Sequence, residues 1–182
     1  ARRLLAEAGA SGLRLQYKTT NVDLRRRVAE AIAADLAAVG IAVDIRPLEW
    51  GALYGDVRRG NFELFSLAWV GISDPDLYFA WLHSSMRPPR GNNRGGYASP
   101  TVDRLTEDAR RATDVATRTA RYREAAGEVA RDVPFVPLWW TDNVAVRSPE
   151  LVGFIPSPSG DLRGLARAHW ADGTPPRRGG GS

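Results

Sequence analysis

The sequence predicts an α/β fold with a mainly parallel sheet flanked by helices. Over residues 13–69 the apolar pattern switches repeatedly between the two-residue period of strands and the longer period of helices. The connections between these segments are short, which favours right-handed crossovers and parallel strands. The hydrophobic share of 43% and the charged share of 25% are close to globular averages, and 182 residues are enough for a buried core.

The alternation is clearest in the first 70 residues. A helix is expected to end at Gly9, and a strand follows over 13–17. The next helix should begin after an N-cap within Thr19–Asn21 and end at Gly40. The remaining elements of this part are a strand stopped by Pro47, a helix over 50–60, and a strand buried on both faces over 62–69.

The second half alternates less regularly. Asp74-Pro75 is typical of the start of a short helix that runs through Leu82, and a long loop follows over 84–97. Two helices are expected next, one opening at Ser99-Pro100 and one at Thr113 or Asp114. Apolar strands are predicted at 134–140 and 144–146, and residues 147–170 carry only weak signals.

The composition excludes several classes of protein. There is no cysteine, so disulfide frameworks and thiolate metal sites are excluded, and no apolar run is long enough to span a membrane. The net charge is +4, but basic and acidic residues are interleaved rather than clustered. A basic nucleic-acid-binding module therefore remains an alternative that no motif supports.

The two ends of the chain differ from an ordinary domain. The chain starts within a helical pattern, without an initiator Met or a signal-peptide core. The last residues are Thr, Pro, Arg, Gly and Ser, which predicts a disordered tail over 171–182. We therefore expect the C-terminal part of a longer protein.

A series of short motifs occurs in a characteristic order and spacing over most of the chain. Together they resemble the C-terminal half of the family 5 extracellular solute-binding proteins, the peptide, nickel and oligosaccharide receptors of ATP-binding-cassette (ABC) importers. The motifs are Leu4-Leu5-Ala6-Glu7-Ala8-Gly9, Val39-Gly40-Ile41, Asp44-Ile45-Arg46-Pro47-Leu48-Glu49-Trp50, Phe62-Glu63-Leu64, Ala68-Trp69, Asp74-Pro75-Asp76, His83-Ser84-Ser85, Asn93-Arg94-Gly95-Gly96-Tyr97, Ser99-Pro100 with Val102-Asp103, and Val136-Pro137-Leu138-Trp139.

The resemblance implies a type II periplasmic-binding-protein-like lobe whose N-terminal partner lobe is absent. Residues 1–140 would form the C-terminal ligand-binding lobe, and 141–170 a return segment that packs on the missing lobe. The implied function is capture of a peptide-like or other small solute for delivery to a membrane permease, in the periplasm or at the cell surface. The resemblance implies a binding protein and not an enzyme, with no cofactor. From the residues themselves we expect no metal site built from protein ligands alone and no nucleic-acid partner.

Two loops are candidate walls of the ligand cleft. The first follows the apolar run, because ligands of open α/β sheets favour the carboxyl ends of strands. There Trp69 could stack on a ligand and Gly71 allows close approach, whereas Asp74 is better suited to capping. The second loop offers an amide, a guanidinium and an aromatic ring. The predicted ligand-binding residues are Trp69, Val70, Gly71, Ile72, Ser73, Asp74, Asn93, Arg94 and Tyr97.

The first loop departs from the family pattern at one position. Peptide receptors of this family place an aspartate after Trp-x-Gly, where it pairs with the α-amino group of the ligand. Here Ile72 stands in that place. Since a buried ammonium without a carboxylate is costly, recognition of a free peptide amino terminus is in doubt.

One enzymatic alternative remains open at this stage. It is a hydrolase in which His83 acts with Ser84 or Asp74. No elbow glycines flank the serines, and the two histidines are far apart in the sequence. We therefore expect His83 to cap or line the end of the short helix.

Overall fold

The computed structural model describes residues 1–173 and divides into two compact units. The first unit comprises residues 1–68 and 76–135, and the second comprises residues 69–75 and the chain from 136 onward. Of the predicted tail over 171–182, residues 174–182 lie outside the described residues. Among the described residues, no helix combines the length and the apolar character that crossing a membrane requires.

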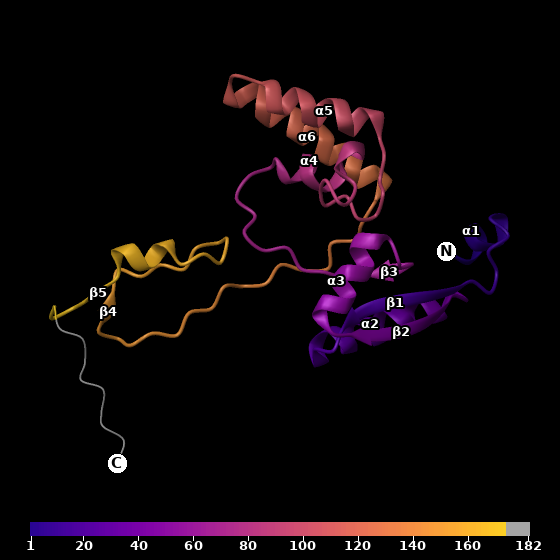
Figure 1. The fold of residues 1–182 in the computed structure, drawn as a ribbon, viewed down its shortest axis with the longest axis horizontal. Helices are drawn as coiled ribbons and strands as arrows, with labels where there is room; N and C mark the ends of the chain where they lie inside the picture. Colours follow the sequence, from indigo (N-terminus) through magenta and orange to yellow (C-terminus); the bar gives the residue numbers. More distant parts are fainter. Residues whose placement is uncertain (174–182) are drawn as a thin grey trace, which may run out of the picture. The chain divides into compact units, whose positions relative to one another are not determined.

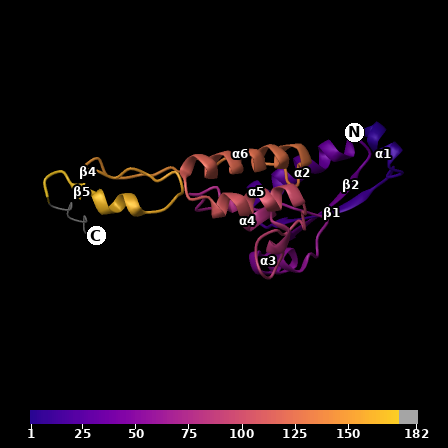
Figure 2. The ribbon, with the colours of Figure 1, turned by 90° about the horizontal axis from the view of Figure 1, so that it is seen from above.

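A three-stranded parallel sheet lies in the first unit, in the order β2-β1-β3. Its strands are β1 (Arg14–Thr20), β2 (Ala42–Leu48) and β3 (Leu64–Phe65). The helix α2 (Asp23–Ala37) connects β1 to β2, and α3 (Trp50–Arg59) connects β2 to β3. These two connections cross in opposite directions, so right-handed crossovers place the helices on opposite faces of the sheet, as Figure 2 shows. The predicted parallel α/β arrangement is confirmed.

The register of β2 explains why a proline occurs within a strand. Residues of β1 pair with β2 from Arg14 with Ala42 to Thr20 with Leu48, which opposes Thr19 to Pro47. The sequence predicts that Pro47 stops this strand, and that prediction is wrong by one residue. Because β2 is an edge strand, a residue without an N–H is tolerated there.

The last strand of the sheet is much shorter than the apolar run over 62–69 predicts. Only two pairs join β3 to β1, Tyr17 with Leu64 and Lys18 with Phe65. No residue of this run is fully buried. The prediction of a strand buried on both faces is therefore wrong for this chain, because β3 is an edge strand and pairs with β1 alone among the described residues.

Some helices of the first unit begin or end at a residue whose side chain or backbone conformation caps them, and others do not. The N-cap of α2 is Val22, which makes no side-chain cap, so the prediction within Thr19–Asn21 is wrong. In α3, the carboxylate of Glu49 accepts a hydrogen bond from the Gly51 N–H, and Gly60 ends the helix in the left-handed conformation. At the N-terminus, α1 (Arg2–Glu7) precedes Gly9, which also has a positive φ.

The other part of the first unit is a group of helices. It contains α4 (Leu77–Leu82), the 3-10 turn η1 (Ser84–Met86), α5 (Pro100–Arg111) and α6 (Val115–Asp132). The two long helices lie side by side in both views (Figures 1 and 2). A small core holds the group together, and it consists of Leu82, Val102 and Val129 with Tyr78, Trp81 and Tyr97 packed against it.

The caps of the two long helices agree with the sequence, and the cap of α4 does not. Ser99 accepts a hydrogen bond from the Val102 N–H, and Asp114 accepts one from the Thr117 N–H. Helix α4 has Asp76 as its N-cap, without a side-chain cap. The predicted start at Asp74-Pro75 is therefore two residues early.

The second unit has little regular structure. An antiparallel pair joins β4 (Leu151–Val152) to β5 (His169–Trp170), and the 3-10 turn η2 (Arg163–Arg167) precedes β5. The predicted strands at 134–140 and 144–146 are wrong for this chain, since these residues have no regular secondary structure. Their side chains are almost all exposed, because no neighbouring strand among the described residues pairs with them.

Candidate functional site

The carboxyl ends of β1 and β3 are the place where this fold positions a binding surface. In an open parallel sheet the connections leave the carboxyl ends of the strands, and the crevice there is the usual ligand site. Here β1 ends at Thr20 and leads into α2, and β2 leads into α3 through Glu49. After Phe65 the chain leaves the sheet, so its next residues line the same edge.

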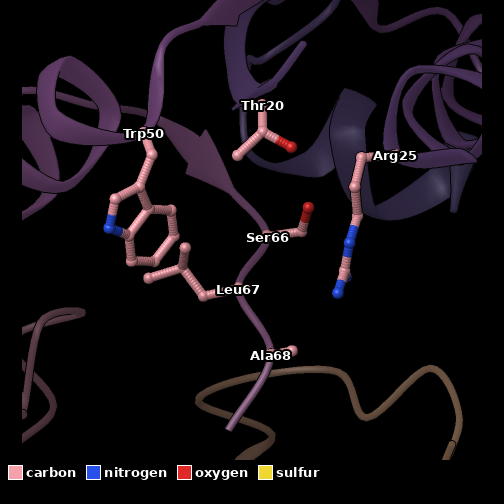
Figure 3. A pocket seen from close by; sticks show the side chains of 6 residues that line it. All are labelled: Thr20, Arg25, Trp50, Ser66, Leu67 and Ala68. Atoms are coloured by element: carbon pink, nitrogen blue, oxygen red, sulfur yellow. The ribbon is translucent and has the colours of Figure 1, made fainter. Parts of the chain in front are cut away.

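A pocket of about 240 Å³ lies at this edge. Figure 3 shows it in the first unit, between the ends of β1 and β3 and the first residues of α2 and α3. Its lining residues are Thr20, Arg25, Trp50, Ser66, Leu67 and Ala68. Our sequence analysis missed all six as site residues, although the rule about carboxyl ends of strands could have indicated Thr20 and Ser66 as well as Trp69.

The pocket has a polar side and an apolar side. In Figure 3, the Thr20 and Ser66 hydroxyls and the Arg25 guanidinium lie on one side, and the Trp50 indole and the Leu67 side chain lie on the other. Arg25 is partly exposed, and it has no ion pair or hydrogen bond with any described residue. The pocket therefore combines an uncompensated positive charge, two hydroxyls and an aromatic face.

An aromatic stack supports the apolar side. The Trp50 ring stacks on Tyr54 with a centroid distance of 5.6 Å. The guanidinium of Arg94 lies 5.2 Å from the centroid of the Tyr54 ring, and its Nη2 is 3.4 Å from the Tyr54 hydroxyl. Of the second predicted loop, Arg94 is thus connected to the pocket indirectly, through Tyr54 and the lining residue Trp50, and does not line the pocket itself.

The other two residues of that loop hold the fold together. Asn93 is 1% exposed; its Nδ2 donates to the carbonyl oxygens of His83 (3.1 Å) and Tyr97 (2.7 Å), and its Oδ1 accepts from the Tyr97 N–H (3.0 Å). The Tyr97 hydroxyl donates to Asp132. Burial and the Asp132 carboxylate raise the pKa of Tyr97. We therefore assign both side chains to the loop's anchoring, because a buried and fully bonded amide has no group left for a ligand.

The first predicted loop belongs to the second unit. Residues 69–75 carry no regular secondary structure, and Gly71 has a φ of 73°. Trp69 is 37% exposed and Val70 is 89% exposed, while Ile72 is partly buried. Ser73 and Asp74 are exposed. These six residues adjoin the pocket residue Ala68 in sequence, and their place in a cleft stays a prediction.

His83 lies in a hydrogen-bonded group that anchors η1. The residue is 6% exposed. Its Nδ1 accepts a hydrogen bond from the Ser85 N–H (3.1 Å) and lies 2.8 Å from the Ser85 hydroxyl, and its Nε2 lies 3.2 Å from a Glu107 oxygen. The Ser84 hydroxyl and N–H both donate to Asp103 of α5. His83 occupies the C-cap position at the end of α4, as the sequence predicts, while its side chain caps the start of η1. The Ser84 bonds tie this turn to α5.

The hydrolase alternative finds no support in this geometry. The Ser84 hydroxyl donates to Asp103 and not to the His83 ring, whose nitrogens lie against Ser85 and Glu107. Among the described residues there is also no group of three or more His, Cys, Asp or Glu side chains that could hold a metal ion.

Comparison with known proteins gives one consistent result. The profile of the bacterial extracellular solute-binding proteins, family 5 (middle part), matches residues 1–88. Di/tripeptide-binding protein 4 of Pseudomonas aeruginosa is 31% identical over 164 residues, which are 87% of this chain and 31% of that protein. The periplasmic oligopeptide-binding protein OppA of Salmonella typhimurium is 26% identical over 85% of this chain and 28% of its own length.

Solved structures agree with the sequence matches. The periplasmic binding protein DppA of Helicobacter pylori, in complex with the peptide STSA, superposes with a TM-score of 0.77 at 29% identity, over 93% of this chain and 34% of that chain. The oligopeptide-binding protein AppA of Bacillus subtilis, in complex with a nonapeptide, gives a TM-score of 0.73 at 22% identity and so compares in fold alone. The chain thus spans roughly a third of the length of these proteins.

The fold and the edge pocket define a lobe of a type II periplasmic-binding-protein-like fold. By sequence and by fold, the chain is similar to family 5 of the bacterial extracellular solute-binding proteins. Its relatives are binding components of ABC importers and not enzymes, which agrees with the non-enzymatic interpretation of the sequence.

Proposed function

We propose that this chain is a ligand-binding lobe of the substrate-binding component of an ABC importer, and that it captures a peptide-like solute. The observation that carries the proposal is the pocket at the carboxyl ends of β1 and β3, which joins hydroxyls, a guanidinium and an indole in one small space. The relatives named above for dipeptides and oligopeptides support the same class of ligand.

The proposed mechanism is closure of a cleft. The pocket of the first unit lies on one wall, and an N-terminal lobe supplied by the rest of the protein forms the other. A ligand that contacts both walls favours the closed state, which then docks on the membrane permease. In this proposal the protein acts in the periplasm or at the cell surface.

The segment that leaves β3 suits a peptide backbone. The ladder between β1 and β3 stops at Lys18 and Phe65, and the chain continues through Ser66, Leu67 and Ala68 beside the pocket. An extended peptide can add its backbone to such an edge, and pockets then select its side chains. Ile72, in the place where peptide receptors of the family carry an aspartate, argues for a ligand bound without that amino-terminal ion pair.

Titration calorimetry with a mixture of di-, tri- and tetrapeptides tests the proposal. The complete protein that carries this sequence should bind peptides in the micromolar range or tighter, about −8 kcal/mol or better. The chain 1–182 alone should bind them about a thousandfold more weakly, because it offers half of the contacts and cannot close. Sub-micromolar binding by the chain alone would contradict the half-cleft proposal, and a complete protein that binds no peptide would contradict the ligand class.

A further inference from the structure

We propose that Arg25 is the residue that selects the ligand, and that the pocket takes a carboxylate next to an apolar side chain. This inference rests on the proposed function and makes its ligand class more specific. A peptide that ends in an aromatic or large aliphatic residue has this chemistry, since its terminal carboxylate and its last side chain leave the same carbon.

The first support is that Arg25 differs from the neighbouring Arg26. Arg26 binds Asp23 and Glu30 on its own helix, with N–O distances of 3.2 and 3.7 Å. Arg25 lines the pocket and has no anionic partner among the described residues. An arginine that is held in a pocket without a counter-ion is a site where an incoming anion replaces water without breaking an existing ion pair.

The second support concerns the kind of anion. Arg25 is the only charged residue of the pocket lining, and the remaining polar side-chain groups are the Thr20 and Ser66 hydroxyls and the Trp50 indole N–H. One guanidinium matches the single charge and the planar oxygens of a carboxylate, which it can bind with two parallel hydrogen bonds. A phosphate carries more charge, and sites for it usually collect several cations or a row of backbone N–H groups.

The third support is the apolar side of the pocket. Trp50 is 54% exposed, although its ring is held by the stack on Tyr54 and therefore has a defined orientation. Leu67 lies beside it in Figure 3, opposite the guanidinium. A ligand that covers this exposed indole gains hydrophobic contact and also removes water from around its own ion pair, which strengthens that pair.

The test compares three tripeptides on the complete protein by titration calorimetry. The probes are Ala-Ala-Phe with a free carboxylate, its carboxyl-terminal amide, and Ala-Ala-Gly with a free carboxylate. The wild type should bind Ala-Ala-Phe about tenfold or more tightly than either of the other two, because a charged hydrogen bond or an aromatic contact is lost in each.

Substitutions assign the two effects to residues. Arg25→Gln should weaken binding of Ala-Ala-Phe about tenfold or more and leave binding of the amide nearly unchanged. Trp50→Ala should remove the preference for Phe over Gly. Arg26→Gln is the matched control, because Arg26 has the same charge one position away and is paired within its own helix; it should keep the full preference for the free carboxylate.

The outcomes separate this inference from the proposed function. If the wild type binds the free peptide and its amide equally, or if Arg25→Gln weakens both equally, the carboxylate site is refuted while peptide binding stands. If the wild type binds none of these probes and none of the peptides of the mixture, the proposed function itself fails. Unchanged binding of the amide to Arg25→Gln also shows that this variant is folded.

Discussion

At the residue scale, neighbouring polar side chains of the loop over 92–97 have different roles: one stabilises the loop, and the other contacts the aromatic stack beside the pocket. Asn93 and Arg94 are neighbours in sequence, yet the amide of Asn93 is buried in carbonyl contacts while the guanidinium of Arg94 stacks on Tyr54. The residue types in 92–97 suit ligand binding and turn formation equally well. Only the direction of each side chain separates the two roles, and that direction depends on contacts distant in the sequence.

Asn93 should therefore affect stability. In Asn93→Ala, the carbonyl of His83 and the N–H of Tyr97 lose their partner in a buried place, which should lower the free energy of unfolding by about 2 kcal/mol. Urea unfolding followed by circular dichroism measures this change. Asn92→Ala is the matched control, because the Asn92 side chain is only partly buried and accepts from Arg94 within the same loop. Equal losses in the two variants would contradict the anchoring role.

A partly buried ion pair makes the stability of the fold depend on pH in the acid range. Lys18 is 6% exposed, and its ammonium lies 2.8 Å from Asp56 and 2.6 Å from the Asn61 carbonyl oxygen. The hydrogen bond from Lys18, followed by that from Arg59, lowers the pKa of Asp56 from 3.8 to about 2. Since the pKa of the folded state is below that of the unfolded state, the contribution of Asp56 is complete above pH 3.8 and is lost as the pH falls toward 2.

Unfolding in urea at several pH values between 5 and 2 should show this loss. The wild type should become less stable over that interval, and Asp56→Asn should lack the part of the slope that Asp56 causes. At neutral pH the variant should be the less stable of the two, because Lys18 is left without its counter-ion. Asp35→Asn, a change on the exposed side of α2, serves as control. If Asp56→Asn lost stability between pH 5 and 2 as steeply as the wild type, Asp56 would not be the cause of that pH dependence.

At the element scale, the ends of helices were predictable where a side chain or a glycine determines them. Ser99, Asp114 and Gly60 act as the sequence indicates. The start of α2 was not predictable, because Val22 makes no side-chain cap and the position follows from where β1 ends. Strand lengths were also mispredicted at β3, since the length of a strand depends on the neighbour that pairs with it.

Two glycines on different helices should respond in opposite ways to alanine. Gly60→Ala should lower the free energy of unfolding by about 1 kcal/mol, because Gly60 ends α3 at a φ of 74°. Gly127→Ala should raise it by about 0.5 to 1 kcal/mol, because Gly127 lies within α6 and its added Cβ meets nothing within 4 Å. Thermal and urea unfolding of the two variants measure both effects, and the same sign for both would contradict the analysis.

At the scale of the whole molecule, the second unit exposes several large apolar side chains of the kind that globular domains usually bury. Trp140 is 83% exposed, Val144 85% and Val146 98%. A strongly apolar segment without a partner strand is typical of a surface that packs against another part of the protein. The predicted return segment over 141–170 and its packing on a further lobe remain a proposal that accounts for this exposure.

Removing these side chains should reduce self-association of the chain and leave its free energy of unfolding nearly unchanged. The double substitution Trp140→Ser with Val146→Ser should reduce self-association of the chain in sedimentation velocity experiments. It should alter the free energy of unfolding by less than about 0.5 kcal/mol, because exposed side chains contribute little to stability. A large loss of stability would show that the segment packs within this chain. The complete protein should respond differently, with a measurable loss of stability, if another lobe covers these residues.

The sequence by itself determined the α/β class, the order of the helices and strands through α6, and the resemblance to the family. Those features depend on periodicity and on caps, which are local along the chain. The tertiary structure alone decided which polar residues face a pocket, that Asn93 is buried, that Arg25 lacks an ion-pair partner within residues 1–173, and how short β3 is. The physical reason is that burial, pairing and charge compensation are properties of groups brought together from distant positions, and no local pattern records them.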